Sequence, residues 1–436
     1  MRSMDAERKN TGGHTVVVGA SLAGLRGAEA LRRAGFAGRL TLVGDEPHRP
    51  YDRPPLSKSA LTGEVAPEAT VLPNLHALAA DWRLGVAATG LDRQAREVRL
   101  ADGTTLSYDR LLIATGSRAR SWPNPTEAGL AGVHTLRGRD DAAALRQALA
   151  PGPKRVLIIG AGFIGCEVAA SCRALDRAVT LIDPGPAPLA RILGQPVGEI
   201  VAALHRALGV DLRSRTKVAR LEGNEAGRVV RAILEDGNVV ETDLVVVALG
   251  AVRNTEWLSG SGLDAGPGGV VCNEAGHALD TEGRPDRAIA AAGDVARFPH
   301  PLFDGRPVAL EHWGHAVAQG EHAGRLLAGE ANETDYAEMP AFWSSQGGIT
   351  IKSVGLTEGA DSMVFAQGSP KEGRFVVVYG AKGRCIAAVS FDSARWLPAY
   401  AEQIAARAPF PPICGGTDEH NLTVLSPGFP EKRTSP

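Results

Sequence analysis

The sequence predicts an α/β protein with two Rossmann-like nucleotide-binding domains and a small α+β C-terminal domain. Two glycine-rich stretches carry most of this prediction, GASLAG at residues 19–24 and GAGFIG at 160–165. Each follows a run of apolar residues, precedes a helical stretch, and is followed by a strand that ends in an acidic residue. This order of strand, glycine turn, helix and strand is the one that dinucleotide binding requires. Beyond about residue 330, alternating apolar positions indicate antiparallel strands.

The two glycine-rich stretches open one unit that occurs twice in the chain. In the first copy we expect a helix at 25–34, a strand at 40–45, a hairpin at 98–108 and a buried strand at 111–116. In the second copy we expect a helix at 166–174, a strand at 179–183, a hairpin at 231–241 and a buried strand at 244–250. The Asp-Gly turn of each hairpin lies 13 residues before the closing glycine, Gly103 before Gly116 and Gly237 before Gly250. The shared spacing favours a true repeat over a chance match.

The remaining segments suggest how the domains are divided. Residues 290–323 match neither repeat, and we expect them to return to the first nucleotide-binding domain, so that the second domain is an insertion. The apolar alternation at 348–356, 374–380 and 385–391, followed by a helix near 393–406, indicates the small third domain. The expected boundaries are 14–121 and 251–330 for the two parts of the first domain, 122–250 for the second, 331–410 for the C-terminal interface domain and 411–436 for an irregular tail.

Composition and charge argue against several classes of function. The chain is 44% hydrophobic and 22% charged with a net charge of -2, and it contains no basic block, so we expect neither nucleic-acid nor membrane binding. The longest apolar runs, such as 244–249, are too short to span a bilayer. The leader at 1–14 lacks the apolar core of a signal peptide. We therefore expect a cytoplasmic protein.

The cysteines show neither a redox motif nor metal-ligand spacing. The five are Cys166, Cys172, Cys272, Cys385 and Cys414, and none belongs to a C-x-x-C pair. Cys166 and Cys172 are the closest pair, but six residues along a helix correspond to about 600° of rotation, which places them on different faces. We therefore expect buried thiols that pack as small apolar groups, and no metal site.

The second glycine-rich stretch has the complete context of a dinucleotide site. Gly160, Gly162 and Gly165 allow a pyrophosphate to approach the helix N-terminus, and Asp183 closes the next strand where it can accept hydrogen bonds from ribose hydroxyls. A carboxylate there would repel a 2′-phosphate, and the next basic residue is Arg191. We predict NADH rather than NADPH at this site. The alternative is a glycine-capped helix without a ligand.

The first stretch departs from the pattern at one position. Gly19 and Gly24 fill the outer glycine positions, whereas Ser21 stands where the middle glycine is expected; Asp45 is the acidic partner. Serine is small, and its hydroxyl can donate to a phosphate, so we expect this site to bind a nucleotide as well.

Seven motifs in order give the chain a specific resemblance. They are GASLAG (19–24), PYDRPPLSK (50–58), YDRLLIATGS (108–117), GAGFIGCEVA (160–169), AAAGDVARF (290–298), EHWGHAVAQG (311–320) and AFWSSQGGITIKSVG (341–355). From about residue 14 to 410 the chain resembles the FAD-dependent, NADH-linked ferredoxin reductases, of the putidaredoxin reductase, rhodocoxin reductase and biphenyl dioxygenase reductase type. The resemblance implies a glutathione-reductase-like fold, with FAD at the first fingerprint and NADH at the second.

The resemblance also implies roles for individual residues. Ala23 and Asp45 would contact the FAD pyrophosphate and adenosine ribose, Asp294 the ribityl chain, and Trp313 the pyrimidine end of the flavin ring. Lys58 would lie near N5, with Arg137 beside the cofactor, Glu167 facing the flavin where nicotinamide docks, and Trp343 over the opposite side. The full set implied to bind cofactor is Gly19, Ser21, Ala23, Gly24, Asp45, Lys58, Ala88, Thr115, Gly116, Arg137, Asp294, Trp313, Gly160, Gly162, Ile164, Gly165, Asp183, Gly250 and Trp343.

Lys58 and Glu167 are the expected catalytic residues. A lysine near N5 places positive charge where negative charge develops. A buried glutamate beside it is costly unless it is paired, so a Lys58 to Glu167 ion pair is expected. Ordinary alternatives exist: a solvated lysine, a helix-terminal acid favoured by the dipole, a core aromatic at Trp343 and an N-cap at Asp294.

Two further departures bear on the cofactor. Arg253 stands where the family usually has proline, close to the expected path of the nicotinamide half, which leaves the cofactor preference slightly open. Asp183 replaces the commoner glutamate and keeps the same logic.

The implied function is hydride transfer from NADH to FAD, followed by single-electron transfer to a ferredoxin that serves a cytochrome P450 or Rieske oxygenase. We expect an acidic partner, with Arg49, Arg53 and Arg306 as a candidate docking rim, and a monomer or weak homodimer. A disulfide reductase needs a cysteine against the flavin, but residues 25–165 contain none. An NADH-dependent reductase of a small acceptor, such as a quinone or oxygen, and a redox-sensing flavoprotein remain alternatives.

Overall fold

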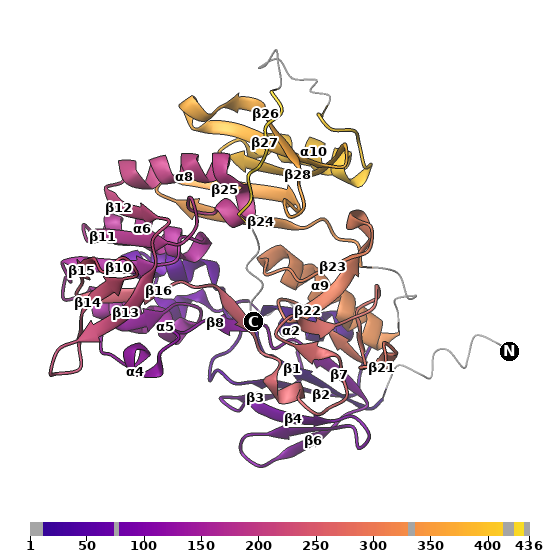
Figure 1. Cartoon of the computed structure of the whole chain (residues 1–436). Coiled ribbons are helices and arrows are strands. Elements are labelled where there is room, and N and C mark those ends of the chain that lie inside the picture. The colour runs from indigo at the N-terminus through magenta and orange to yellow at the C-terminus, as the bar shows by residue number, and fades with distance from the viewer. Residues whose placement is uncertain (1–11, 74–77, 330–335, 413–422, 431–436) are drawn as a thin grey trace. The chain divides into compact units, whose positions relative to one another are not determined.

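The protein divides into two compact units, and each is described by itself. A computed structural model of the chain describes residues 12–73, 78–329, 336–412 and 423–430. The first unit comprises the described parts of Met1–Asp52, Val71–Arg118 and Val252–Ala341, and the second those of Arg53–Thr70, Ala119–Ala251 and Phe342–Pro436. Figure 1 follows the elements in chain order. The chain leaves the first unit within β8 (Ser117–Ala119) and re-enters it within β17 (Ala251–Arg253).

The first unit is built on a six-stranded sheet in the order β20-β21-β7-β1-β2-β3. Its strands are β1 (His14–Val18), β2 (Arg39–Gly44), β3 (Asp81–Leu84), β7 (Arg110–Ile113), β20 (His277–Leu279) and β21 (Pro285–Ala291). All neighbouring pairs are parallel except β20 with β21. The central strands are buried on both faces, which explains their continuous apolar runs. Because β21 pairs with β7, a segment far along the chain completes the sheet that the N-terminus begins.

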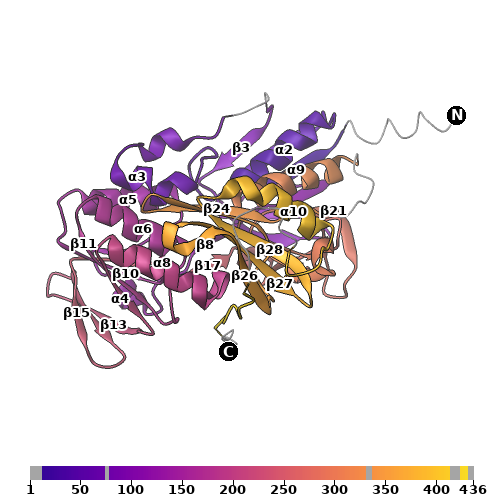
Figure 2. The same cartoon turned by 90° about the horizontal axis from the view of Figure 1, so that it is seen from above.

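Two helices lie side by side in the first unit, α2 (Leu22–Arg33) and α9 (Trp313–Ala328) (Figures 1 and 2). Glycines make this close approach possible. A Cβ on Gly320 would lie 2.4 Å from the Ala23 carbonyl oxygen, and one on Gly324 would lie 2.2 Å from the Gly27 carbonyl oxygen. Helix packing therefore explains Gly320 and Gly324 of the stretch EHWGHAVAQGEHAG, whereas Gly314 faces open space.

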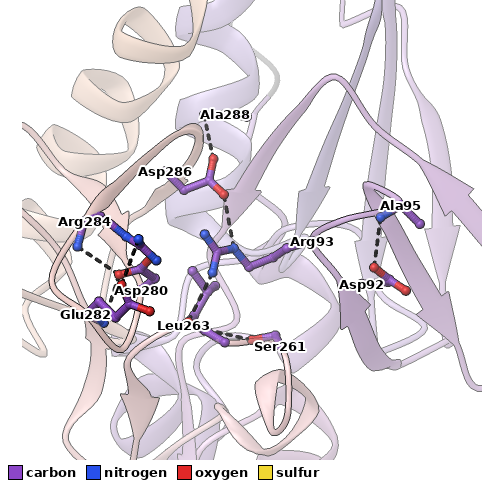
Figure 3. A network of polar contacts seen from close by, with 11 residues as sticks. Asp92, Arg93, Ala95, Ser261, Leu263, Asp280, Glu282, Arg284, Asp286 and Ala288 are labelled. Atoms are coloured by element: carbon purple, nitrogen blue, oxygen red, sulfur yellow. Dashed lines mark hydrogen bonds and ion pairs between the residues drawn. The ribbon is translucent and has the colours of Figure 1, made fainter.

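A small antiparallel sheet is tied to β21 by an ion pair. It consists of β4 (Ala88–Asp92), β5 (Glu97–Leu100) and β6 (Thr105–Ser107). Arg93 follows β4 and points toward Asp286 on β21, with Nε 3.2 Å from Oδ2 (Figure 3). The Arg93 Nη1 atom also donates to the Gly262 carbonyl at 3.1 Å. The unit also contains a four-stranded sheet of β18 (Ala265–Gly266), β19 (Gly269–Val271), β22 (Ala296–His300) and β23 (Arg306–Val308).

The second unit repeats the architecture of the first. Its parallel sheet has the order β12-β11-β10-β16-β9, which corresponds to β3-β2-β1-β7-β21 of the first unit. The strands are β9 (Val133–Thr135), β10 (Arg155–Ile159), β11 (Ala178–Asp183), β12 (Val210–Ser214) and β16 (Leu244–Val247), and an antiparallel sheet is formed by β13 (Val218–Gly223), β14 (Val229–Leu234) and β15 (Val239–Glu241). The helices are α3 (Ser59–Thr62), α4 (Pro125–Ala128), α5 (Arg139–Leu149), α6 (Phe163–Ala174), α7 (Ala190–Leu193) and α8 (Gln195–Ala207).

The C-terminal sheet is grouped with this second unit. Its order is β24-β25-β28-β27-β26, from strands β24 (Ala341–Gln346), β25 (Ile349–Gly355), β26 (Ser362–Ser369), β27 (Arg374–Ala381) and β28 (Arg384–Phe391), followed by α10 (Leu397–Ala405). The buried Tyr379 hydroxyl donates to the Leu193 carbonyl at 2.7 Å. Part of the expected irregular tail is also attached, because Leu425 forms an antiparallel bridge with Met363; Cys414 lies outside the described residues.

Both fingerprint helices begin three residues earlier than the sequence suggested. α2 begins at Leu22 rather than Leu25, and α6 begins at Phe163 rather than Cys166. The N-caps are Ser21 and Gly162, so the helix starts inside the glycine-rich stretch itself. The apolar periodicity becomes visible only after these first turns, which is why it gave late starts.

Candidate cofactor and active site

The outer glycines of the first fingerprint are required by the fold. Gly19 has φ +117°, and a Cβ there would lie 2.0 Å from the Ala114 carbonyl oxygen. A Cβ on Gly24 would lie 1.9 Å from the Gly19 carbonyl oxygen. Gly19 also donates its N–H to the Val43 carbonyl at 2.8 Å, which holds the turn against β2. No larger residue fits at either position.

The middle position tolerates serine for a geometric reason. Ser21 has φ -111° and ψ -156°, and its counterpart Gly162 has φ -76° and ψ -173°, so both are in extended backbone open to any residue. A Cβ on Gly162 would meet no atom within 4 Å. The Ser21 side chain makes no capping bond to α2. The hydroxyl therefore lies at a helix N-terminus without being used by the helix, which fits a phosphate ligand.

The loops after β1, β7 and β21 meet at the carboxyl edge of the first sheet. Ser117 Oγ donates to Asp294 Oδ2 at 2.8 Å, and a Cβ on Gly293 would lie 3.0 Å from the Ala23 Cβ. Gly116 has φ +60°, with open space where a side chain would point. Expected FAD residues from these three loops are thus brought together. Ligands bind at this edge of open α/β sheets, and the open glycines fit a dinucleotide.

Two polar residues that sequence reasoning missed hold these loops. The buried Gln319 side chain accepts from the Gly293 N–H at 2.8 Å. Asn254 Nδ2 donates to the Thr115 carbonyl at 2.9 Å, and Thr115 Oγ1 donates to the Asn254 carbonyl at 2.7 Å. Gln319 lies inside the motif EHWGHAVAQG, but the motif did not indicate its role, and Asn254 lies outside the seven motifs.

The other residues expected near FAD lie in the same unit. Asp45 is exposed directly after β2, and its Oδ1 accepts from the Glu46 N–H. Ala88 is half-buried at the start of β4, just beyond Val86, whose N–H donates to the Gly44 carbonyl. Trp313 begins α9, and its indole N–H donates to Asp52 Oδ1 at 2.7 Å.

Arg253 makes its side-chain contacts within the first unit. Its Nε atom donates to the Asp294 carbonyl at 2.8 Å, and its Nη2 atom lies 3.2 Å from Glu311 Oε1. The side chain is only 18% exposed. The guanidinium is therefore engaged within the first unit by two segments that carry expected FAD residues.

The second fingerprint repeats the geometry of the first. A Cβ on Gly160 would lie 2.3 Å from the Ala248 carbonyl oxygen, and one on Gly165 would lie 1.9 Å from the Gly160 carbonyl oxygen. Gly162 and Gly250 instead face open space. Gly162 has extended backbone and need not be glycine, whereas the left-handed φ of +87° at Gly250 still favours glycine. Ile164, in the first turn of α6, is 39% exposed. An exposed apolar residue beside an open glycine at a helix N-terminus fits a bound nucleotide.

Asp183 is fixed by the fingerprint loop. Its Oδ2 accepts from the Ala161 N–H at 2.8 Å, and its Oδ1 accepts from the Gly185 N–H at 2.7 Å. Each carboxylate oxygen retains a lone pair for a further donor. The residue is half-buried at the end of β11, where a ribose hydroxyl would be accepted.

Lys58 and Glu167 form an ion pair in the second unit. Lys58 Nζ lies 2.7 Å from Glu167 Oε2, and the Glu167 side chain is only 4% exposed. The same oxygen accepts from Ser57 Oγ at 2.5 Å, and Oε1 accepts from Ser344 Oγ at 2.6 Å. Neither serine was identified from the sequence. Lys58, Ser57 and Ser344 thus place three donors around the buried carboxyl group of Glu167.

Arg137 and Trp343 also lie in this unit. The Arg137 N–H donates to Asp141 Oδ2 at 2.8 Å, and its carbonyl accepts from Arg53 Nη1 at 3.0 Å. Trp343 is 41% exposed on β24, so it is not a core aromatic. Trp343 is exposed and the next residue, Ser344, is buried, as expected for successive residues of a strand.

The cysteines in the described part of the chain, Cys166, Cys172, Cys272 and Cys385, are all buried free thiols. Burial raises the pKa of Cys172 and of Cys272 to about 12, so neither is a reactive thiolate at neutral pH. Among the same residues, no group of three or more His, Cys, Asp or Glu side chains is placed to hold a metal ion. No helix in the described ranges is long and apolar enough to cross a membrane.

Comparison with known proteins places this geometry in a family. The profile of the family described as "Pyridine nucleotide-disulphide oxidoreductase" matches residues 13–320, and that described as "Reductase C-terminal" matches residues 341–416. The ferredoxin--NAD(+) reductase component of an anthranilate 1,2-dioxygenase system from Burkholderia cepacia is 38% identical, with 90% of this chain and 94% of the relative covered. Putidaredoxin reductase CamA from Pseudomonas putida is 37% identical, with 87% and 88% covered.

Solved structures agree with this assignment. The reductase fold of a covalent putidaredoxin reductase–putidaredoxin complex superposes with a TM-score of 0.84 at 34% identity, covering 92% of this chain and 94% of that chain. These matches cover the two nucleotide-binding folds with their fingerprints and the C-terminal sheet. The chain therefore belongs to the pyridine nucleotide-disulphide oxidoreductase family, among its ferredoxin reductases.

Proposed function

We propose that this protein oxidises NADH and passes the electrons singly to a ferredoxin through a bound FAD. FAD, when bound, supplies the conversion from two-electron to one-electron chemistry. The observation that carries the proposal is the pair of equivalent fingerprints, each with two glycines that the fold requires and a middle residue in extended backbone at a helix N-terminus. Membership of the ferredoxin reductases supports the acceptor.

The two units divide the binding work. In the first, Gly19, Ser21 and Gly24 would hold a pyrophosphate, and Asp45 would accept from the adenosine ribose. Thr115, Gly116, Asp294 and Trp313 supply the remaining contacts, with Ala23 and Ala88 lining the site. In the second, Gly160, Gly162, Ile164, Gly165 and Gly250 would form the NADH site.

Asp183 sets the preference for NADH. Its carboxylate is oriented by two backbone amides before any ligand arrives, so it is ready to accept from a ribose and would repel a 2′-phosphate. Arg253 does not counter this preference, because its guanidinium is bound to Asp294 and Glu311.

Lys58 and Glu167 serve the reacting edge. The ammonium group of Lys58 would stabilise negative charge that develops on the flavin, and Glu167 would hold that ammonium in place. Arg137 and Trp343 are the further residues of this unit proposed to contact the cofactor.

The electron acceptor is proposed to be an acidic ferredoxin that serves a cytochrome P450 or Rieske oxygenase. Of the three arginines proposed as a docking rim, Arg49 stacks over the Trp82 ring at 4.3 Å and Arg306 over the Phe303 ring at 5.9 Å. Arg53 instead donates to the Arg137 carbonyl, so its charge is partly used inside its own unit. We further propose that the protein is a monomer or weak homodimer. We also propose that it works in the cytoplasm, and the buried free thiols support this location.

Anaerobic stopped-flow spectroscopy tests the function. NADH should bleach the flavin within the dead time or soon after, and an added ferredoxin should reoxidise it faster than dioxygen does. Slow reduction with a long-lived charge-transfer band would instead support a redox-sensing flavoprotein. Faster reoxidation by a quinone than by any ferredoxin would support a small-acceptor reductase, and the appearance of new thiols on reduction would support a disulfide reductase.

A further inference from the structure

A buried chain of hydrogen bonds continues from Glu167 into the C-terminal sheet. Ser344 Oγ lies 2.6 Å from Glu167 Oε1, Gln346 Nε2 lies 3.1 Å from Ser344 Oγ, and His205 Nε2 lies 2.9 Å from Gln346 Oε1. Ser344 and Gln346 are each 1% exposed, and His205 is fully buried. This series of hydrogen bonds lies entirely in the second unit and joins α6, β24 and α8.

The chemistry of each group fixes the direction of this chain. The Gln346 amide oxygen can only accept, so His205 must carry its proton on Nε2. The Gln346 nitrogen can only donate, so Ser344 must accept from it. The single proton of the Ser344 hydroxyl then has to point at Glu167, which receives it as an acceptor.

Reversing the chain would change the protonation of Glu167. If the Gln346 amide were turned over, Ser344 would donate to Gln346, and only a protonated Glu167 could then donate to Ser344. The direction of the amide and the charge of the carboxyl group are therefore coupled. Lys58 Nζ at 2.7 Å and Ser57 Oγ at 2.5 Å are both placed to donate to Oε2, so Glu167 is surrounded by donors, which is the arrangement of the first direction.

We propose that Ser344, Gln346 and His205 are positioning residues that keep Glu167 ionised and aim its Oε2 at Lys58. The inference rests on the proposed function only for the role of Glu167 beside the flavin. The protonation state of Glu167 can be measured whether or not that function is correct. β24 presents Ser344 and Gln346 to the interior, while Trp343 and Ser345 face outward. Two of the three positioning residues therefore lie on one face of the C-terminal sheet.

Other titratable groups do not compete for Glu167. The elements packed against α6 carry Arg155 on β10, Asp183 on β11, Lys58 after η1 (Pro54–Ser57), and Glu199, His205 and Arg206 on α8. Within the described residues, Lys58 is the cation that pairs with Glu167, whereas Arg155 pairs with Asp243. The neighbouring Cys166 has its pKa raised by burial, so it remains a thiol. Burial likewise lowers the pKa of His205, which keeps it neutral at pH 7.

The test reads Glu167 directly in the FAD-loaded protein without NADH or ferredoxin. Infrared titration follows the carbonyl band of a protonated carboxylic acid, assigned to Glu167 by its loss in Glu167→Gln. Ser344→Ala removes the donor to Glu167 Oε1 and adds no carboxyl group. It should raise the pH midpoint of Glu167 by about one unit or more, a tenfold change in its proton affinity. Gln346→Met, which removes the donor to Ser344, should raise the midpoint less, and Ser344→Thr should restore the wild-type midpoint.

Matched controls come from the same sheet. The hydroxyls of Ser353 on β25 and Ser390 on β28 are buried and make no hydrogen bond in the described structure, so Ser353→Ala and Ser390→Ala should leave the midpoint unchanged. Nitrogen-15 spectra of labelled histidine should show the Nε2–H tautomer for His205. An unchanged midpoint in both Ser344→Ala and Gln346→Met, or an Nδ1–H tautomer of His205, would overturn the proposal. Because no turnover is involved, this result is distinct from a failure of NADH to reduce the flavin.

Discussion

Lys58 Nζ lies 2.7 Å from Glu167 Oε2, and the carboxylate is almost completely buried. Each charge is costly to bury without the other, so the pair should behave as one unit. In Glu167→Gln the ammonium group loses its counter-ion and its fixed direction. Flavin reduction by NADH should slow by roughly tenfold or more in single-turnover stopped-flow. Glu199→Gln, an exposed carboxylate on α8, is the control; equal rates in both variants would remove Glu167 from the mechanism.

Arg253 should affect the retention of FAD and not the choice between NADH and NADPH. Its guanidinium joins the Asp294 carbonyl to Glu311, in two segments expected to hold FAD. Arg253→Ala should therefore release FAD several times faster in a dilution assay followed by flavin fluorescence, since a charge-assisted hydrogen bond contributes about 1.5–3 kcal/mol. The exposed Arg297→Ala on β22 should not. A changed ratio of NADH to NADPH activity in Arg253→Ala would contradict this prediction and indicate that Arg253 lies close to the bound nicotinamide cofactor.

A group of buried histidines should make the protein sensitive to acid. Burial lowers the pKa of His315 from 6.5 to about 3 and that of His312 from 6.5 to about 4. Below pH 6.5 the unfolded chain therefore binds protons at these two histidines, whereas the folded chain keeps them neutral. Stability is complete above pH 6.5 and falls as the pH drops from 6.5 toward 4, by about 1.4 kcal/mol per pH unit for each histidine.

Urea unfolding at several pH values measures this effect. His315 stacks on Phe298, with centroids 5.5 Å apart, and its Nδ1 lies 3.1 Å from the Tyr336 hydroxyl. His315→Asn removes one titrating group, so its unfolding free energy should depend less steeply on pH below 6.5, although the variant is less stable at pH 8. Parallel curves for variant and wild type would show that His315 does not titrate in this range.

The repeated fold could be predicted from the sequence because its signals are local. The glycine spacing, the acidic strand ends and the Asp-Gly hairpins each report on a few neighbouring residues, and the two sheets have the corresponding strand order. β24 and β26 were missed. β24 reads AFWSSQ, whose buried positions are polar side chains that satisfy one another, so it lacks the apolar alternation of a strand.

The site was predictable only where a motif marked it. Lys58 and Glu167 lie 109 residues apart, and the family resemblance supplied their pairing, which the structure contains. Ser344 and Gln346 lie inside the motif AFWSSQGGITIKSVG, but the motif did not indicate their role, because the partners of a buried hydroxyl and amide lie on other elements. For Arg253, nothing in the sequence indicated its hydrogen-bond partners, which lie 41 and 58 residues away. Its expected place near the nicotinamide half stays a prediction.

Ser21 should be interchangeable with glycine but not with a large residue. Its backbone is extended, and the corresponding position in the second fingerprint faces open space. Ser21→Gly should retain FAD with an affinity within about tenfold of wild type, since the loss of one hydroxyl hydrogen bond costs on the order of 1 kcal/mol. Ser21→Leu should purify largely without flavin and keep its secondary structure by circular dichroism. Full flavin content in Ser21→Leu would place the FAD pyrophosphate elsewhere.

The central claim is that the two fingerprints have different ligands, and Asp183→Ala tests it most directly. The measurement is the FAD content of the purified variant together with its KM for NADH. We predict full flavin content, a KM raised by roughly tenfold or more and a smaller change in kcat, because a binding contact is lost while the reacting groups are intact. Asp211→Ala, an exposed carboxylate on β12, should match wild type in both quantities. Loss of FAD in Asp183→Ala with an unchanged KM for NADH would contradict the division of labour between the two sites.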